Sequence, residues 1–325
     1  MKKRNILVCG ATGFIGRNTA EALARRADLA VTGVYNRRPP FQCPGLSWVK
    51  ADLTRADDVA RIVSGADVIV QAAATTSGIR DTTLRPHIHI ADNAVMNSLI
   101  FRAAHDRKVG HVVFFSCSVM LGSGEQALTE SDFDANAEIA PRYFGIGWTK
   151  VYIEKMCEFY ARLGTTRYTA IRHSNIYGPH DKFDLERSHV FGATVTKAMT
   201  AADGRIVVWG SGEEARDLLH VDDLVEFVIA AVDRQKAPFA LYNCGAGSAV
   251  TVKELAHMII AASGRDLRIE HDLTKPTMTN TLALDCRKAE HELGWRPKVS
   301  LNEGISRTIA WWRDNIGAEA KASVS

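Results

Sequence analysis

The chain has 325 residues, of which 46% are hydrophobic and 24% charged, so it can bury a large core and exceeds the length of one small domain. Its 40 basic and 37 acidic residues leave a net charge of +3, which gives no reason to expect nucleic acid or a membrane as the main partner. No run of 18 apolar residues occurs, and residues 1–4 lead directly into an apolar segment, so we expect a cytoplasmic protein without a signal peptide. The six cysteines show no C-x-x-C spacing, which predicts reduced thiols and neither a zinc site nor a disulfide framework.

Near the start of the chain, residues 5–16 read N-I-L-V-C-G-A-T-G-F-I-G. The apolar run predicts a buried strand, and Gly10 permits a tight turn at its end. Gly13 lets the backbone approach a pyrophosphate, and Gly16 lets the following helix pack on the sheet, with its N-terminus facing the phosphates. The segment therefore predicts a dinucleotide-binding turn. The residues expected to line it are Gly10, Thr12, Gly13, Phe14, Ile15 and Gly16.

Apolar strand-like runs alternate with helical stretches through the first half of the chain, a rhythm typical of βαβ units. Unbroken apolar runs at 68–70 and 112–115 indicate strands that are covered on both faces. The sequence therefore predicts an α/β fold with a Rossmann-type, doubly wound parallel sheet. The expected elements are, in chain order, 5–10, 14–27, 30–35, 56–64, 67–72, 92–107, 111–116 and 147–163.

Beyond about residue 172 the pattern becomes irregular, with glycine-containing loops between short elements, which predicts a smaller α/β substrate lobe. The strand-like segment 241–244 is expected to rejoin the main sheet, and a last helix is expected from about 301 to 315. We therefore expect the following domains. The dinucleotide-binding domain covers 1–172 and is rejoined by about 217–243, and the substrate-binding lobe covers 173–216 and 244–325.

The end of the second expected strand bears on the choice of cofactor. In dinucleotide folds a carboxylate at this place binds the ribose hydroxyls of NAD(H), whereas arginines neutralise the 2′-phosphate of NADP(H). Here 31–35 is followed by Asn36, Arg37 and Arg38, with no carboxylate. The sequence favours NADP(H) over NAD(H), although a solvated loop that simply carries two arginines would look the same.

Two later strand ends supply further candidate cofactor contacts. Asp52 can reach the adenine amino group together with the backbone N–H of Leu53. Ala72, Ala73 and Ala74 are small enough for the backbone to approach the cofactor, although small side chains after a strand also suit ordinary packing.

Taken together, several segments resemble the extended short-chain dehydrogenase/reductase (NAD-dependent epimerase/dehydratase) family, which acts mainly on nucleotide-activated sugars. These segments are G-A-T-G-F-I-G at 10–16, A-D-L at 51–53, A-D-N-A-V-M-N around Asn93, F-F-S-C-S-V-M-L-G at 114–122 and G-W-T-K at 147–150. Within the family the chain is most similar to the GDP-L-fucose synthase branch, the GDP-4-keto-6-deoxymannose epimerase/reductases. That likeness rests on 72–79, 175–183 with 188–190, 207–212 and 216–224.

The resemblance implies roles for individual residues. Ser116 resembles the catalytic hydroxyl, with Ser118 two residues further on. Lys150 resembles the lysine that binds the nicotinamide ribose and favours a neighbouring phenolate. His189 resembles the acid/base beside the sugar carbon, and Asn93 is expected among the cofactor contacts. The substrate-binding residues that the resemblance implies are Asn175, Lys182, His189, Val190, Trp209 and Arg216.

The family's catalytic tyrosine lies four residues before the lysine, and this chain has Ile146 there. An isoleucine neither donates nor accepts a proton, so the usual proton relay is absent. Tyr143 is the nearest phenol, seven residues before Lys150, and it is the candidate replacement. Pro141 and two glycines argue against an unbroken helix across that interval.

Two further departures narrow the chemistry. Ser118 stands where the fucose-synthase pattern has a cysteine, which weakens the case for two-base epimerisation because a serine exchanges protons poorly. Cys117 is one position off, so we expect its thiol to point the other way on a strand. Thr281 and Leu282 stand where the family places a phosphate-binding cation, a role that Lys275 or Arg287 could take instead. Residues 117–118 replace the Asp-Glu pair of the sugar-nucleotide dehydratases, which argues against dehydration.

Two functions remain open. The first is an NADP-dependent oxidoreductase or epimerase that acts on a nucleotide-activated 4-keto-6-deoxy sugar by hydride transfer. The second is a catalytically silent NADP-binding protein, a sensor or assembly subunit. A homodimer is expected through the helices near 92–107 and 147–163, with Met156, Phe159 and Tyr160 as its apolar stripe, unless that stripe faces the core.

Overall fold

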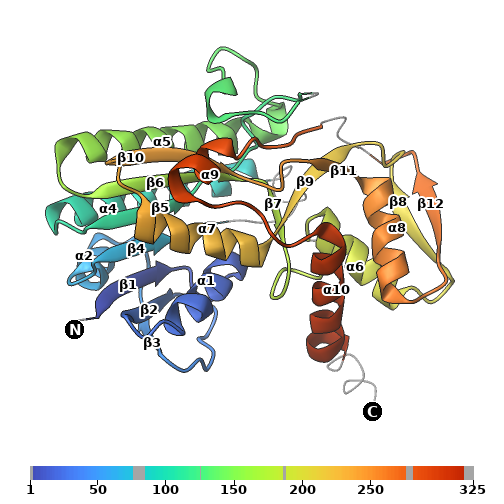
Figure 1. Cartoon of the computed structure of the whole chain (residues 1–325), viewed down its shortest axis with the longest axis horizontal. Coiled ribbons are helices and arrows are strands. Elements are labelled where there is room, and N and C mark those ends of the chain that lie inside the picture. The colour runs from blue at the N-terminus through green and yellow to red at the C-terminus, as the bar shows by residue number, and fades with distance from the viewer. Residues whose placement is uncertain (1–2, 76–84, 125, 186–187, 276–280, 318–325) are drawn as a thin grey trace.

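The computed structural model describes residues 3–75, 85–124, 126–185, 188–275 and 281–317, which form a larger and a smaller lobe (Figure 1). In the part of the chain so described, no helix is long and apolar enough to span a membrane. All six cysteines carry free thiols.

The larger lobe is built on a seven-stranded sheet in the order β10-β6-β5-β4-β1-β2-β3, and every neighbouring pair of strands is parallel (Figure 1). The chain starts in the middle of the sheet, moves outward to β3 and returns to β4 on the other side of β1. Ligands of such sheets bind at the carboxyl ends of the strands, near the point where the winding reverses. The seven strands are β1 (Arg4–Cys9), β2 (Leu29–Tyr35), β3 (Leu46–Lys50), β4 (Val68–Gln71), β5 (His111–Phe115), β6 (Arg167–His173) and β10 (Phe239–Cys244).

Helices pack on both faces of this sheet and bury a separate apolar cluster on each. This arrangement confirms the predicted Rossmann-type, doubly wound α/β fold. On one face lie α1 (Phe14–Ala24), α7 (Val221–Arg234) and α9 (Arg287–Leu293), and on the other lie α2 (Ala56–Val63), α4 (Ala91–Asp106) and α5 (Phe144–Leu163).

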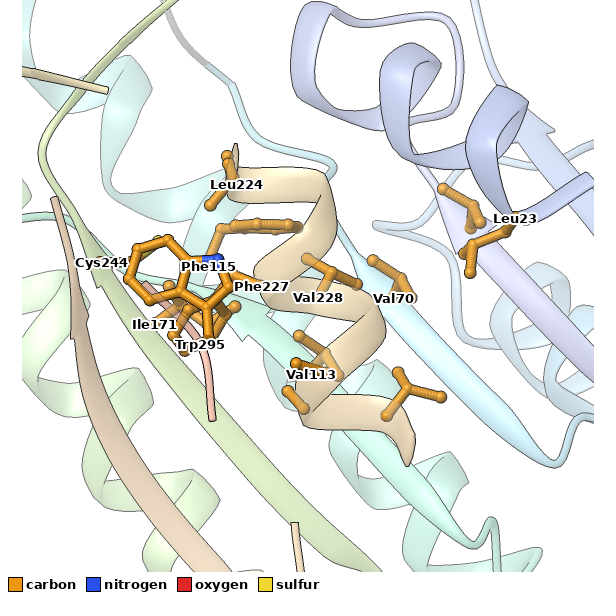
Figure 2. Close-up of a cluster of buried hydrophobic side chains, with 14 of the residues drawn as sticks. Leu23, Val70, Val113, Phe115, Ile171, Leu224, Phe227, Val228, Cys244 and Trp295 are labelled. Carbon is orange, nitrogen blue, oxygen red and sulfur yellow. The ribbon is translucent and has the colours of Figure 1, made fainter. Parts of the chain in front are cut away.

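Helix α7 illustrates how the core forms. Leu224, Phe227 and Val228 recur at helical spacing, so they make one buried stripe. Figure 2 shows this stripe lying over the sheet beside Phe115 and Trp295. The rings of Phe227 and Trp295 meet edge-on with their centroids 4.9 Å apart. This packing fixes β5, whose carboxyl end enters the candidate site.

The smaller lobe follows β6 and contains two small sheets. In one, β9 pairs in parallel with β7 and antiparallel with β11, and in the other β8 pairs in parallel with β12. The chain enters the smaller lobe, returns to the large sheet at β10 beside β6, and leaves it again (Figure 1). The elements of this lobe are β7 (Asn175–Tyr177), α6 (Val190–Thr200), β8 (Arg205–Trp209), β9 (Ala215–His220), β11 (Ala249–Thr251), α8 (Val252–Ser263), β12 (Arg268–Asp272) and α10 (Leu301–Trp312).

Candidate active site

The glycine turn after β1 has the geometry of a diphosphate cradle. Gly10 has a φ of 74°, and a Cβ placed on it would lie 2.7 Å from the backbone N and Cα of Ala73. A Cβ on Gly16 would lie 2.2 Å from the carbonyl oxygen of Gly10, so only glycine lets α1 pack this closely on the turn. Gly13 is the N-cap of α1 and brings no side chain over the first-turn N–H groups. These residues fit a dinucleotide, whose diphosphate would be bound by that helix N-terminus.

The exposed segment after β2 lies beside this turn. Asn36, Arg37 and Arg38 are solvent-exposed, and the Arg38 guanidinium donates from Nη1 to the carbonyl oxygen of Thr12 at 2.8 Å. The backbone N–H of Ala11 also bonds to β2, through the Val34 carbonyl at 3.2 Å. A cationic segment is therefore fixed against the turn, at the place expected for the adenosine ribose.

Asp52 follows β3 and is oriented by its neighbours. Its Oδ1 accepts from the backbone N–H and the hydroxyl of Thr54, at 3.0 and 2.7 Å, and these bonds lower the pKa of the carboxyl. The backbone N–H of Asp52 itself donates to Asp58 at 2.8 Å, and the next residue, Leu53, is buried. The carboxylate is thus ionised and held at the carboxyl edge of the sheet.

Asn93 has its polar atoms directed at backbone groups. Its amide nitrogen donates to the carbonyls of Thr75 and His89, at 3.1 and 2.6 Å, and its amide oxygen accepts from the N–H of Thr75 at 3.0 Å. Asn93 therefore positions the segment 72–75 after β4, which includes the three small alanines. Residues 76–79, the second half of the segment 72–79 on which the family resemblance partly rests, lie outside the described residues.

Lys150 lies at the carboxyl end of β5. Its Nζ donates to the carbonyl oxygen of Phe115 at 2.7 Å and lies 4.8 Å from the ring centroid of Phe114. Burial lowers the pKa of the ammonium, whereas Cys117 and Glu154 oppose that shift. A buried cation at this strand end is suited to hold an anionic or hydroxyl-bearing ligand.

Helix α5 is continuous from Phe144, three residues before the start that the sequence predicts. Ile146 therefore lies one turn before Lys150 on the same helix. Tyr143 lies outside the helix as its N-cap, at the end of a 3-10 turn, and packs against a small buried cluster that includes Met120 and Ile139. The phenol is thus not one helical turn from the lysine.

The structure gives Ser116 a different environment from the one that the sequence suggests. Ser116 is fully buried and its hydroxyl donates to Oε1 of Glu154 at 2.5 Å. Glu154 is paired with Arg172 through bonds of 2.7 and 3.0 Å. The Ser116 hydroxyl therefore joins β5 to α5 and β6 within a buried ion-pair network. Burial raises the pKa of the thiol of the next residue, Cys117, and the charge of Lys150 opposes this shift.

In the smaller lobe, His189 lies close enough to Lys182 for the two side chains to interact electrostatically. His189 is the N-cap of α6 and keeps exposed surface, and burial followed by the charge of Lys182 lowers its pKa. A Cβ on Gly192 would lie 2.3 Å from the carbonyl oxygen of Lys182, so this glycine lets the loop close on α6. Ser188 adds a hydroxyl bond of 2.6 Å to that carbonyl. Val190, half-buried, is the first residue of α6.

His173, which the sequence analysis did not single out, lies at the end of β6 and is influenced by both Lys150 and His189. It keeps part of its surface accessible and meets the Phe115 ring edge-on, with centroids 6.3 Å apart. Burial is the main cause that lowers its pKa, to about 4, and the charges of Lys150 and His189 lower it further. Lys150 from α5 and His189 from α6 therefore act on one imidazole.

A second group of residues lies toward the smaller lobe. Trp209 ends β8 with 44% of its surface exposed, and the ammonium groups of Lys197 and Lys275 lie 5.9 and 5.8 Å from its ring centroid. Arg287 is the alternative to Lys275 as the phosphate-binding cation. Its Nε donates to Oδ2 of Asp285 at 2.7 Å. The exposed indole with two nearby cations is suited to an aromatic, anionic ligand.

Arg216 lies on β9 in the same lobe. Burial lowers the pKa of its guanidinium and Arg142 adds to this effect, whereas Glu214 and then Tyr143 oppose it. Its Nη1 donates to the carbonyl of Ala215 at 2.9 Å. A bound anion would offset the repulsion that Arg142 exerts on this guanidinium. Asn175 on β7 points elsewhere, since its amide donates to the carbonyl of Asp217 at 3.2 Å.

Among the residues that the structure describes, no group of three or more histidine, cysteine, aspartate or glutamate side chains could hold a metal ion.

The model of the "NAD dependent epimerase/dehydratase family" matches residues 6–245, about three quarters of the chain. The chain belongs to this family. Its members include NAD(P)-dependent nucleotide-sugar epimerases and reductases.

Individual epimerase/dehydratase relatives match the whole chain. GDP-L-fucose synthase 1 of Arabidopsis thaliana is 31% identical over 97% of this chain and 95% of its own length. Among solved structures, UDP-glucose 4-epimerase of Thermotoga maritima with UDP-glucose has a TM-score of 0.85 at 24% identity, covering 96% of this chain and 99% of that chain. The dTDP-glucose 4,6-dehydratase of Streptomyces venezuelae, with NAD and TYD bound, has a TM-score of 0.79 at 26% identity, covering 97% and 98%.

The sequence analysis missed His173 and Arg142 and expected Cys117 to point away from the site, all for one reason. His173, Cys117 and Arg142 are ordinary residues along the chain and gain meaning only from neighbours on other elements. The available signal was position, because His173 and Cys117 both follow strands whose carboxyl ends lie side by side.

Proposed function

We propose that the protein is an NADP-dependent oxidoreductase or epimerase that transfers hydride to or from a nucleotide-activated sugar of the 4-keto-6-deoxy class. The observation that carries this proposal is the position of Lys150 at the carboxyl end of β5, where its Nζ donates to the Phe115 carbonyl at 2.7 Å and the Phe115 ring meets His173. The charge of His189, at the start of α6, also acts on His173. Lys150 belongs to the dinucleotide-binding lobe and His189 to the smaller lobe, so a substrate held by the second would meet a cofactor held by the first. A protein that only bound dinucleotide would not need this meeting point.

The cofactor would lie along the carboxyl edge of the sheet, where a nicotinamide dinucleotide accepts or supplies hydride. The glycine turn would bind its diphosphate, and Arg37 and Arg38 would bind the 2′-phosphate that distinguishes NADP(H). Asp52 would bind the adenine. Lys150 would hold the nicotinamide ribose, as its 2.7 Å bond at the end of β5 supports.

The nucleotide part of the substrate would occupy the smaller lobe. Arg216, with Arg142 near it, would bind the diphosphate, and the exposed face of Trp209 would stack on the base or ribose. Lys197 or Lys275 would supply the phosphate-binding charge that the family usually has at the positions of Thr281 and Leu282. Lys182, His189 and Val190 would surround the sugar.

We further propose that Ile146 occupies the position of the family's catalytic tyrosine, since it lies one helical turn before Lys150. The geometry favours Cys117 over Ser116 as the group beside the reacting carbonyl, because Ser116 donates to Glu154. Proton transfer must then come from another side chain. Ser118 is buried, and Tyr143 lies toward Arg216 rather than toward Lys150.

The direct test is turnover. Purified protein should oxidise NADPH in the presence of a 4-keto-6-deoxy sugar linked to GDP, dTDP or UDP, with NADH at least tenfold less effective. Product analysis by NMR would show whether stereochemistry at the neighbouring carbons changes. No NADPH consumption with the whole panel, by protein that binds NADPH, would reject the proposal.

One observation favours a second candidate, a catalytically silent NADP-binding protein. Ile146 removes the usual proton donor, and loss of a general acid–base group costs about 10²–10⁴-fold in rate. Calorimetry separates the two functions. Tight NADPH binding with no affinity for any nucleotide sugar would favour the silent protein, whereas micromolar binding of a nucleotide sugar would favour the enzyme.

A further inference from the structure

We propose that His173 is the general base of this protein, accepting the proton of a sugar hydroxyl while hydride leaves the same carbon. This inference rests on the proposed function and assigns the proton-transfer step that Ile146 cannot perform. It identifies a side chain on β6, rather than on α5, as the proton acceptor.

Hydrogen bonding fixes the tautomer of the imidazole. Nδ1 of His173 lies 2.8 Å from the carbonyl oxygen of Ser174. A carbonyl only accepts, so Nδ1 carries the hydrogen and Nε2 carries the lone pair. The Ser174 carbonyl is itself held, because the backbone N–H of Ser174 donates to the carbonyl of Cys244 on β10 at 2.9 Å. A neutral imidazole oriented by a fixed acceptor is the arrangement that a general base requires.

Burial is the main cause that keeps the ring neutral near pH 7, against the bond to the Ser174 carbonyl, which raises the pKa of His173. Lys150 on α5 and His189 at the start of α6 both disfavour the imidazolium. His189 is itself neutral near pH 7, because burial and the charge of Lys182 lower its pKa.

Two thiols lie in this region, since Cys244 pairs with His173 across the strands and Cys117 is influenced by Lys150. Burial raises the pKa of both thiols, so they remain uncharged and do not offset the charge of Lys150. Arg172, the residue before His173, is paired with Glu154.

The step is balanced as an alcohol oxidation. The C–H bond of the sugar carbon breaks and its electron pair leaves as hydride to the nicotinamide dinucleotide, which is the oxidant. The O–H proton passes to Nε2 of His173, and a carbonyl forms. The imidazolium then releases the proton to solvent, a step that the positive charge of Lys150 favours. The reverse step, ketone reduction, uses the imidazolium as the acid.

This assignment predicts opposite pH dependences for the two directions. Because the pKa of His173 is about 4, the base form predominates throughout the neutral range. In the oxidation direction kcat/KM should be constant between pH 6 and 8. In the reduction direction kcat/KM should increase about tenfold for each unit by which the pH falls, since the imidazolium fraction increases in that proportion.

The main variant is His173→Asn. The Asn amide can still donate to the Ser174 carbonyl but accepts no proton at neutral pH. We expect kcat/KM for a 6-deoxy nucleotide sugar with NADP⁺ to fall about 10²–10⁴-fold, with unchanged affinity for NADPH. Adding Ile146→Tyr to this variant should restore at least tenfold, because a phenol one turn before Lys150 supplies the missing proton transfer. Ile146→Phe, of similar bulk and without a hydroxyl, should restore nothing, and the exposed His257→Asn should match the wild type.

A second readout needs neither turnover nor cofactor. Long-range ¹H–¹⁵N spectra of the free protein should show His173 as the Nδ1–H tautomer at pH 7, titrating near pH 4. An Nε2–H tautomer, or titration above pH 6, would overturn the inference whatever the activity.

The kinetic outcomes separate the inference from the proposed function. Active wild-type protein with a His173→Asn variant within threefold of it would reject His173 and leave the proposed function standing. A wild-type protein that binds NADPH and turns over no nucleotide sugar would reject both. If His173→Asn unfolds, His173→Gln with a thermal melt replaces it, and a folded, fully active Gln variant would also overturn the inference.

Discussion

The hydroxyl of Ser116 is used inside the protein rather than at its surface. It is fully buried and donates to Glu154, whose carboxylate also pairs with Arg172, so one oxygen connects residues of β5, α5 and β6. A hydrogen bond to a buried charge contributes more to stability than a bond between neutral groups. If Ser116 is a structural residue, its removal should affect stability. If it is catalytic, its removal should affect kcat.

Ser116→Ala should lower the free energy of unfolding by about 1.5–3 kcal/mol, the usual contribution of a hydrogen bond to a charged group. Its kcat should stay within threefold of the wild-type value, because the Ser116 hydroxyl donates to Glu154 and is fully buried. Urea denaturation and steady-state kinetics measure the two effects. Cys117→Ala is the matched variant, expected to lower kcat more than tenfold. A Ser116→Ala protein of unchanged stability and much reduced kcat would contradict this assignment.

His111 has only 1% of its surface exposed, and its Nε2 bonds to the hydroxyl of Thr169 at 2.7 Å. Burial, aided by Arg167 and Arg4, lowers its pKa from 6.5 to about 3. The unfolded chain therefore binds one more proton than the folded protein between these two pH values. The contribution to stability is fully present above pH 6.5 and is lost as the pH falls toward 3.

The free energy of unfolding should thus fall with decreasing pH below 6.5, by at most about 1.4 kcal/mol per pH unit from this one group. His111→Gln keeps a donor for Thr169 and does not titrate, so it should flatten the curve between pH 6.5 and 5. Urea denaturation at half-unit steps checks this, with the exposed His257→Gln as control. Parallel curves for His111→Gln and wild type would show that His111 is not buried neutral.

Among the elements, helix α5 has one face toward the candidate site and an opposite face exposed to solvent. Its inward face carries Lys150 and Glu154 to the carboxyl end of β5. Its outward face leaves Tyr152, Phe159 and Leu163 more than half exposed, at a spacing that places all three on one side. Two residues of the stripe expected from the sequence, 156 and 160, instead pack partly buried against the core, and only Phe159 is exposed.

This outer face predicts a homodimer. Val95, on the neighbouring helix α4, is 44% exposed and extends the patch. Two copies related by a two-fold axis would bury the patch of each against the other. Light scattering after gel filtration should give twice 35.6 kDa. Phe159→Asp should give the monomer mass, and Leu273→Asp, an exposed residue of the smaller lobe, should not. A monomeric wild type at tens of micromolar would contradict the prediction.

For the whole molecule, the sequence predicts what depends on local pattern. The glycine turn, the alternation of strands and helices and the doubly wound sheet all follow from periodicity and residue size, and the structure has them. Side-chain direction just beyond a strand does not follow, because the two-residue alternation ends with β5 at Phe115. The expectation that Ser116 faces the site and Cys117 points the other way extended that alternation beyond the end of the strand. His173 depends on neighbours 23 and 16 residues away, on two other elements.

The choice of cofactor can be tested through the stability of the whole fold. A ligand that binds only the folded protein stabilises it by about 2.7 kcal/mol at 100 times its Kd. NADPH should therefore raise the Tm, by roughly 2–4 °C for each kcal/mol in a chain of this size. Changing Arg37 and Arg38 together to alanine should remove most of the shift with NADPH and retain the shift with NADH. The exposed Arg296→Ala is the control. Equal loss with both coenzymes would mean that the arginines bind a part common to both, and no shift with either in the wild type would reject dinucleotide binding.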